Sequence, residues 1–145
     1  QDWSDSVGGD GIPFNNVSGH GAPNNSDQWI ELVNIGAPVD LTGWTVEFMN
    51  IAAVLVTVPV GSVTLNPYDR HVIGNPGDIG LSSTLTLRDS TEQIKDVVNL
   101  GAIHTLFGFA TGVGNESLER IPDGLDTGQT ADFKRRSATI NAFNH

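Results

Sequence analysis

From residue 28 onward, the chain is built of short runs in which apolar and polar positions alternate. The run at residues 44–48 is the most regular, with Trp44, Val46 and Phe48 on one face and polar residues on the other. Successive side chains of a β-strand point to opposite faces, so this period of two predicts a strand with one buried face. We therefore expect Trp44, Val46 and Phe48 to lie in the core.

Further runs of this kind, separated by turn residues, predict more strands. Ile51–Val60 is apolar at nearly every position, which is typical of a strand buried on both faces. The other runs are Trp29–Val33, Val63–Leu65, His71–Ile73, Leu85–Arg88, Ile94–Val98 and Leu118–Ile121. We expect Leu85 and Leu87 to face the core strand from across the fold. No window of a dozen residues keeps a helical period, so the prediction is an all-β sandwich or barrel with few or no helices.

Residues 1–27 differ from the rest of the chain in composition. They are rich in Gly, Asn, Ser and Asp, and their large apolar residues are Trp3, Ile12, Phe14 and Val17. This composition predicts an extended N-terminal arm rather than a helix. Residues 28–145 are expected to form the folded domain.

Two groups of motifs carry a family resemblance. They occupy Trp29–Gly36 with Val39–Trp44, and Ser117–Gly124 with Asp126–Gly128 and Ala131–Phe133. In this order they resemble the lamin tail domain, especially its prokaryotic members, over residues 28 to 144. The pair Leu85–Asp89 and Ile94–Val98 is similar to a hairpin of the same family.

The resemblance implies an immunoglobulin-like β-sandwich. It also implies a secreted or surface-attached, non-catalytic module of the kind that is often appended to hydrolases. The chain departs from the family in two places. Residues 1–27 lack the short apolar strand with which most members begin, and Ile140 and Phe143 stand where the family usually has a Pro-Gly turn. An unfilled sheet edge is therefore expected, together with apolar groups that a closed monomer does not need: the Ile51–Val60 segment, Ile140 and Phe143.

Charge narrows the choice of partners. The 145 residues include 7 Lys and Arg against 17 Asp and Glu, a formal net charge of −10. So acidic a surface repels phosphate backbones and disfavours nucleic acid as a partner. No apolar run approaches the roughly 20 residues needed to insert into a membrane as a spanning helix. The absence of cysteine excludes disulfides and thiol chemistry.

The N-terminus and the glycosylation motifs favour an extracellular or cell-surface location. The chain opens with Gln1 rather than Met, as a chain processed after secretion would. Asn-X-Ser sequons make Asn16, Asn24 and Asn115 glycosylation candidates.

The sequence gives little support for catalysis. The four histidines, His20, His71, His104 and His145, lack any zinc-ligand spacing, and no Gly-X-Ser-X-Gly elbow is present. Glu31 and Glu47 could face each other across adjacent strands like a glycosidase pair, but both are expected on an outward structural face. We expect no enzyme activity.

Calcium and glycans are the candidate ligands. Hard cations take oxygen ligands from flexible Asp- and Gly-rich loops. The candidate calcium ligands are Asp2, Asp5 and Asp10 in the arm and Asp123, Asp126 and Asp132 in a late loop, although ordinary turn chemistry explains them equally well. Trp29, expected to face outward, and Trp3 could stack on sugars, although Trp29 could instead pack under the N-terminal arm. The basic triplet at residues 134–136 is expected to flank a strand end rather than to bind nucleic acid.

The sequence thus predicts a non-catalytic extracellular structural domain whose partner is protein, first of all copies of itself. Such a domain could assemble into a filament or surface layer by docking a terminal segment as an added strand on a neighbour's open edge. Equally, Val17 or Trp3 could fold back and fill this edge within the same chain. The candidate interaction residues are Trp3, Ile12, Phe14, Val17, Trp29, Ile140 and Phe143. The alternative is an accessory glycan-binding or calcium-dependent targeting module of a larger secreted enzyme.

Overall fold

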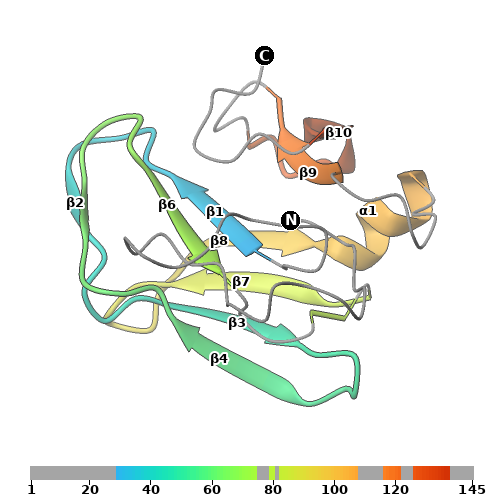
Figure 1. The fold of residues 1–145 in the computed structure, drawn as a ribbon, viewed down its shortest axis with the longest axis horizontal. Coiled ribbons are helices and arrows are strands. Elements are labelled where there is room, and N and C mark those ends of the chain that lie inside the picture. Colours follow the sequence, from blue (N-terminus) through green and yellow to red (C-terminus); the bar gives the residue numbers. More distant parts are fainter. Residues whose placement is uncertain (1–28, 75–78, 81, 108–115, 122–125, 138–145) are drawn as a thin grey trace, which may run out of the picture. The chain divides into compact units, whose positions relative to one another are not determined.

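The computed structural model describes residues 29–74, 79–80, 82–107, 116–121 and 126–137, and structural statements below concern these residues. They form antiparallel strands with little helix, which confirms the all-β prediction (Figure 1). The strands are β1 (Trp29–Val33), β2 (Val39–Asp40), β3 (Thr45–Met49), β4 (Leu55–Pro59), β5 (Thr64–Leu65), β6 (Arg70–Gly74), β7 (Thr84–Arg88), β8 (Ile94–Asn99), β9 (Glu116–Arg120) and β10 (Phe133–Ser137). The helices are α1 (Leu100–Phe107) and the 3₁₀ turn η1 (Thr130–Asp132).

The chain divides into two compact units that interleave along the sequence. The first contains two antiparallel pairs, β1 with β6 and β9 with β10. In the second pair Phe133 lies opposite Arg120, whose guanidinium carbon lies 5.2 Å from the centre of the Phe133 ring. The basic triplet at residues 134–136 lies inside β10 rather than at its end.

The second unit is organised around a four-stranded antiparallel sheet in the order β4-β3-β7-β8, beside the short pair β2–β5 (Figure 1). Strand β3 is paired on both sides, so Val46 lies opposite Val58 of β4 and Leu87 of β7. Strands β7 and β8 form a hairpin, as the family resemblance implied. Helix α1 follows β8 directly, and the Leu100 N–H donates to the Ser83 carbonyl at 2.9 Å.

The predicted core strand is largely confirmed. Val46 and Phe48 are buried, whereas Trp44 precedes β3 and is only half-buried. The prediction that Leu85 and Leu87 face β3 from across the fold is wrong, because β7 is hydrogen-bonded to β3 in the same sheet. The other buried apolar residues of this unit are Leu41, Val60, Leu65, Ile79, Leu100 and Ile103.

The prediction of one doubly buried strand over Ile51–Val60 is also wrong. Asn50 turns the chain there: its side-chain oxygen accepts the N–H groups of Ala52 and Val54 at 3.0 and 2.9 Å. The first four residues of the segment therefore form an exposed hairpin loop, and only β4 after it is a strand. Exposure alternates along β4, as expected of a strand with one buried face. Among the described residues, no helix is long and apolar enough to cross a bilayer.

Candidate interaction surface

The two glutamates considered as a carboxylate pair are each held by an arginine. Glu31 of β1 lies 3.7 Å from Arg70, and Arg88 Nε donates to Glu47 Oε2 at 2.7 Å. This hydrogen bond raises the pKa of Arg88. Because β1 pairs with β6 and β3 pairs with β4 and β7, the two glutamates do not lie on adjacent strands. The arrangement supports a structural role for both carboxylates.

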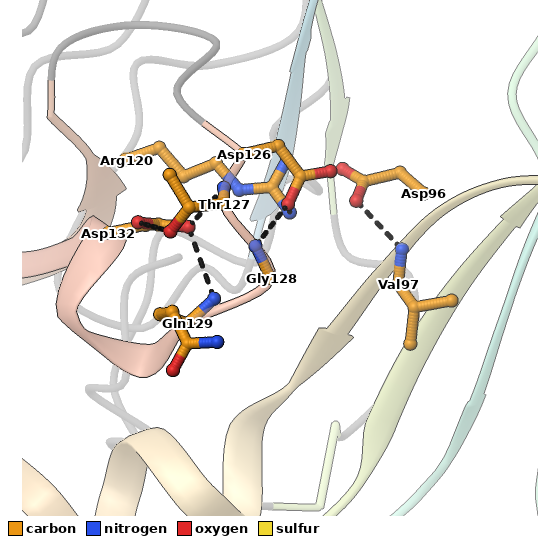
Figure 2. A network of polar contacts seen from close by, with 8 residues as sticks. All are labelled: Asp96, Val97, Arg120, Asp126, Thr127, Gly128, Gln129 and Asp132. Atoms are coloured by element: carbon orange, nitrogen blue, oxygen red, sulfur yellow. Dashed lines mark hydrogen bonds and ion pairs between the residues drawn. The ribbon is translucent and has the colours of Figure 1, made fainter.

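The late acidic loop is organised around the buried carboxylate of Asp132. Figure 2 shows Thr127 and the backbone nitrogen of Gln129 directed at this carboxylate. The Thr127 hydroxyl donates to Oδ1 at 2.6 Å, and the backbone N–H groups of Thr127 and Gln129 donate to Oδ2 at 2.7 and 3.3 Å. Donation from Thr127, above all from its hydroxyl, holds the pKa of Asp132 below its ordinary value. Asp132 therefore fixes residues 127–129, directly before η1.

The other described calcium candidate, Asp126, is also engaged within the loop. Its Oδ1 accepts the Gly128 N–H at 3.1 Å and lies 3.7 Å from Arg120 Nη2 (Figure 2). Within the described residues, no group of three or more His, Asp or Glu side chains is placed to hold a metal ion. The contacts around Asp126 and Asp132 are those of a hydrogen-bonded turn. The remaining calcium candidates, Asp2, Asp5, Asp10 and Asp123, lie outside the described residues.

Trp29 is buried at 4% exposure, so the prediction that it faces outward is wrong. The side chain offers no open face on which a sugar could stack. Its strand explains the error, since both Trp29 and its neighbour Ile30 are buried and β1 begins with two covered positions rather than one. The other candidate interaction and glycosylation residues lie outside the described residues: Trp3, Ile12, Phe14, Val17, Ile140, Phe143, Asn16, Asn24 and Asn115.

Strand β4 is an outer strand of the four-stranded sheet, and its backbone pattern follows from two hydrogen bonds. The Val60 N–H donates to the Trp44 carbonyl and the Asn50 N–H donates to the Val54 carbonyl, both at 2.9 Å. In an antiparallel ladder, bonded and non-bonded pairs alternate. The bonded pairs between these two ends are therefore those that join the even-numbered residues of β3 and β4.

The odd-numbered residues of β4 consequently turn their backbone groups away from β3. These groups are the N–H and C=O of Leu55 and Thr57 and the C=O of Pro59, which has no N–H. No strand in the described part of the chain pairs with this side of β4. The side chains of the same three residues are exposed, and Leu55 is 61% exposed. A row of backbone donors and acceptors with exposed side chains is a site for strand addition.

The segment that contains this edge carries no charged residue of its own, although Glu47 of β3, held by Arg88, lies opposite Thr57. No Asp, Glu, Lys, Arg or His occurs from Phe48 to Tyr68. Exposed large apolar side chains gather in the same stretch, at Met49, Ile51, Val54 and Leu55. On a chain with a net charge of −10, this is a surface that a like-charged molecule can approach.

The other outer strand of the sheet, β8, has the features that natural proteins use to block edge pairing. It carries Lys95 and Asp96, and its register with β7 shifts between Leu87 and Arg88. Lys95 Nζ also lies 2.8 Å from Asp89 Oδ2 in the preceding turn. Strand β4 has neither charge nor register shift, and Pro59 at its end is its one blocking residue.

The hairpin loop that leads into β4 is apolar and held by Asn50. In addition to the bonds of its side chain, Asn50 accepts the Ala53 N–H at its backbone carbonyl, at 2.9 Å. Ala53 adopts a left-handed φ of 58°. Ile51 is 65% exposed at the tip. The sequence pattern marked Ile51–Val60 as apolar surface that a closed monomer does not need, but it predicted a doubly buried strand where the chain forms an exposed loop and an edge strand. The alternation of Val56, Thr57 and Val58 after an Asn was the signal for a half-buried strand behind a turn.

No family model, curated protein or solved structure matches this chain. The candidate site therefore stands on its own geometry.

Proposed function

We propose that this chain is a non-catalytic structural domain that associates with protein, first of all with copies of itself, by strand addition at the outer edge of β4. The observation that carries the proposal is the alternation of β4: backbone groups of Leu55 and Thr57 point away from β3 in a strand with no charged residue. The lamin-tail resemblance of residues 28–144 agrees with a structural role and adds an extracellular or cell-surface location to the proposal.

Physical chemistry favours protein as the occupant of this edge. An added strand is held by main-chain hydrogen bonds. When it docks, it also covers the exposed apolar side chains of Leu55 and Pro59, which removes them from water. Polymeric nucleic acid is disfavoured because the chain is acidic. Within the described residues, no observation favours the accessory glycan or calcium module, since Trp29 is covered and Asp126 and Asp132 are held in a turn.

The test is the association state of the full chain at increasing concentration, measured by sedimentation velocity. Thr57→Lys places a charge on the β4 edge, and we expect it to reduce association at least about tenfold, the effect of roughly 1.4 kcal/mol in binding free energy. Thr84→Lys is the matched control, because Thr84 is equally an exposed threonine of this sheet but lies in β7, which has neighbours on both sides. A full chain that stays monomeric at millimolar concentration, or equal effects of the two substitutions, would contradict the proposal.

A further inference from the structure

We infer that the occupant of the β4 edge is β4 of a second copy of this chain, running antiparallel about a two-fold axis at Thr57. This inference rests on the proposed function and specifies its partner and register. It would join two four-stranded sheets into one continuous sheet across the pair.

Backbone geometry supplies the first argument. The outward-facing backbone groups belong to Leu55, Thr57 and Pro59, so a new strand must form its bonded pairs with these residues. The antiparallel register that overlaps all of β4 with itself sets Thr57 opposite Thr57 of the partner subunit. The two threonines then exchange both N–H···O=C bonds, and each Leu55 N–H reaches the carbonyl of Pro59 of the partner subunit.

This register also gives the proline a suitable place. Pro59 has no N–H, and its opposite residue in the pairing is Leu55 of the partner subunit. The Leu55 carbonyl of each copy therefore has no donor on the other strand. It lies at the end of the paired segment, where water can reach it. Proline is tolerated in this kind of position, at the end of an edge pairing.

The distribution of charge supplies the second argument. In a two-fold pairing, each residue meets the one at the same distance on the other side of Thr57. The nine residues before Thr57, from Phe48, and the nine after it, to Asn66, are all uncharged. The edge therefore meets its copy without bringing like charges together, although each chain carries a net charge of −10.

The exposed apolar side chains supply the third argument. On the outer face, Leu55 would lie beside Pro59 of the partner subunit, and Pro59 beside the partner's Leu55. Towards the hairpin loop, Val54 would approach Val60 of the partner subunit. Exposed apolar groups thus meet uncharged positions at both ends of the pairing.

The pairing is closed rather than propagating. A two-fold contact uses the same edge on both copies and leaves the two β8 strands as the outer strands of the joined sheet. Since β8 carries Lys95, Asp96 and a register shift, this sheet stops at two copies. A filament would need a second contact elsewhere on the chain.

Disulfide trapping tests the register in the full chain, which has no cysteine of its own. Opposed residues of a bonded antiparallel pair have Cα atoms about 5.5 Å apart, inside the range of roughly 4.4–6.8 Å that a disulfide spans. Thr57→Cys should therefore give a covalent dimer on mild oxidation. A register slipped by two residues moves the two Cα atoms about 7 Å apart along the strands, beyond reach of a disulfide. The control is Thr84→Cys, an exposed threonine away from the edge.

We expect Thr57→Cys to form the linked dimer at least about tenfold faster than Thr84→Cys, because pairing raises the effective thiol concentration. Sedimentation of the unsubstituted chain is measured alongside. If the chain associates and Thr57→Lys weakens it, but Thr57→Cys links no faster than Thr84→Cys, the two-fold pairing is overturned while the proposed function stands. In that case, a terminal segment of a neighbouring chain becomes the candidate occupant. If the unsubstituted chain does not associate at all, both are overturned.

Discussion

Phe48 and Met49 are neighbours in β3 but lie in opposite environments: Phe48 is 1% exposed and Met49 is 39% exposed. The pleat of the strand sends one side chain into the core and the other onto the outer face of the sheet. Phe48 lies opposite Val56 of β4, and Met49 lies opposite Leu55. A step of one residue along β3 thus separates the core from the apolar surface that flanks the β4 edge.

Truncating these two side chains should have very different costs. We expect Phe48→Ala to lower the free energy of unfolding by about 3–5 kcal/mol, because it removes a large buried side chain and leaves a cavity. Met49→Ala, the control in the next position, should change it by less than about 1 kcal/mol. Urea denaturation measures both. Equal losses, or a small loss for Phe48→Ala, would show that the strand register is wrong.

Gly80 is expected to accommodate a side chain poorly. A Cβ built there would lie 3.0 Å from the carbonyl oxygens of both Met49 and Asn50, which are backbone atoms. The Gly80 N–H also donates to the Met49 carbonyl at 3.0 Å, so the glycine and the end of β3 are tied together. Gly80→Ala should therefore lower the thermal midpoint clearly. Gly36→Ala, whose Cβ would meet only the Asn34 side chain at 3.7 Å, should change it little.

The loop held by Asp132 should weaken in acid. Its pKa is lowered in the folded chain, so the unfolded chain binds a proton first as the pH falls past the ordinary value of 3.8. The stabilisation is complete above that value and disappears as the pH drops through the lowered pKa.

Asp132→Asn removes this titration. The stability difference between wild type and variant should be largest near neutral pH and shrink below pH 3.8. Urea denaturation between neutral pH and pH 3 measures it. Because the pKa values of Asp40 and Asp89 are also lowered, only the difference between the two curves reports on Asp132. Parallel curves would contradict the role assigned to Asp132.

Salt should stabilise the chain, because its net charge of −10 produces self-repulsion that ions screen. We expect a higher melting temperature in molar NaCl than in dilute buffer.

Calcium at matched ionic strength tests the predicted calcium ligands in the arm and the late loop, with magnesium as the comparison. A rise specific to calcium and reversed by chelation would support a site. The same melting temperature in all matched buffers would show that the acidic segments are ordinary turns and not a calcium site.

The fold class could be predicted from the sequence because alternation is a local signal. The burial of Val46 and Phe48 in β3 follows from residues a few places apart, and so do the two strands β7 and β8, whose pairing as a hairpin came from the family resemblance. Which strands pair is not local. Leu87 was expected across the fold from Phe48, yet β7 is hydrogen-bonded beside β3, and nothing in either run specifies its neighbour.

The candidate surface could be predicted only in part, for a related reason. Apolar composition alone made Ile51–Val60 look like core, but a side-chain hydrogen bond pattern at Asn50 turns its first residues into a loop. Trp29 shows the converse: its outward reading followed the alternation with Ile30, and both side chains are buried. Burial depends on what covers a strand, which its own sequence does not state.

Amide hydrogen exchange at β4, resolved by residue and followed with concentration, tests the central claim most directly. In the isolated chain, the N–H groups of Val56 and Val58 are bonded to β3, while those of Leu55 and Thr57 point outward. Strand addition should therefore slow exchange at Leu55 and Thr57 as concentration rises and leave Val56 and Val58 unchanged. Exchange at Leu55 and Thr57 that is equally fast, or equally slow, at every concentration would contradict the account.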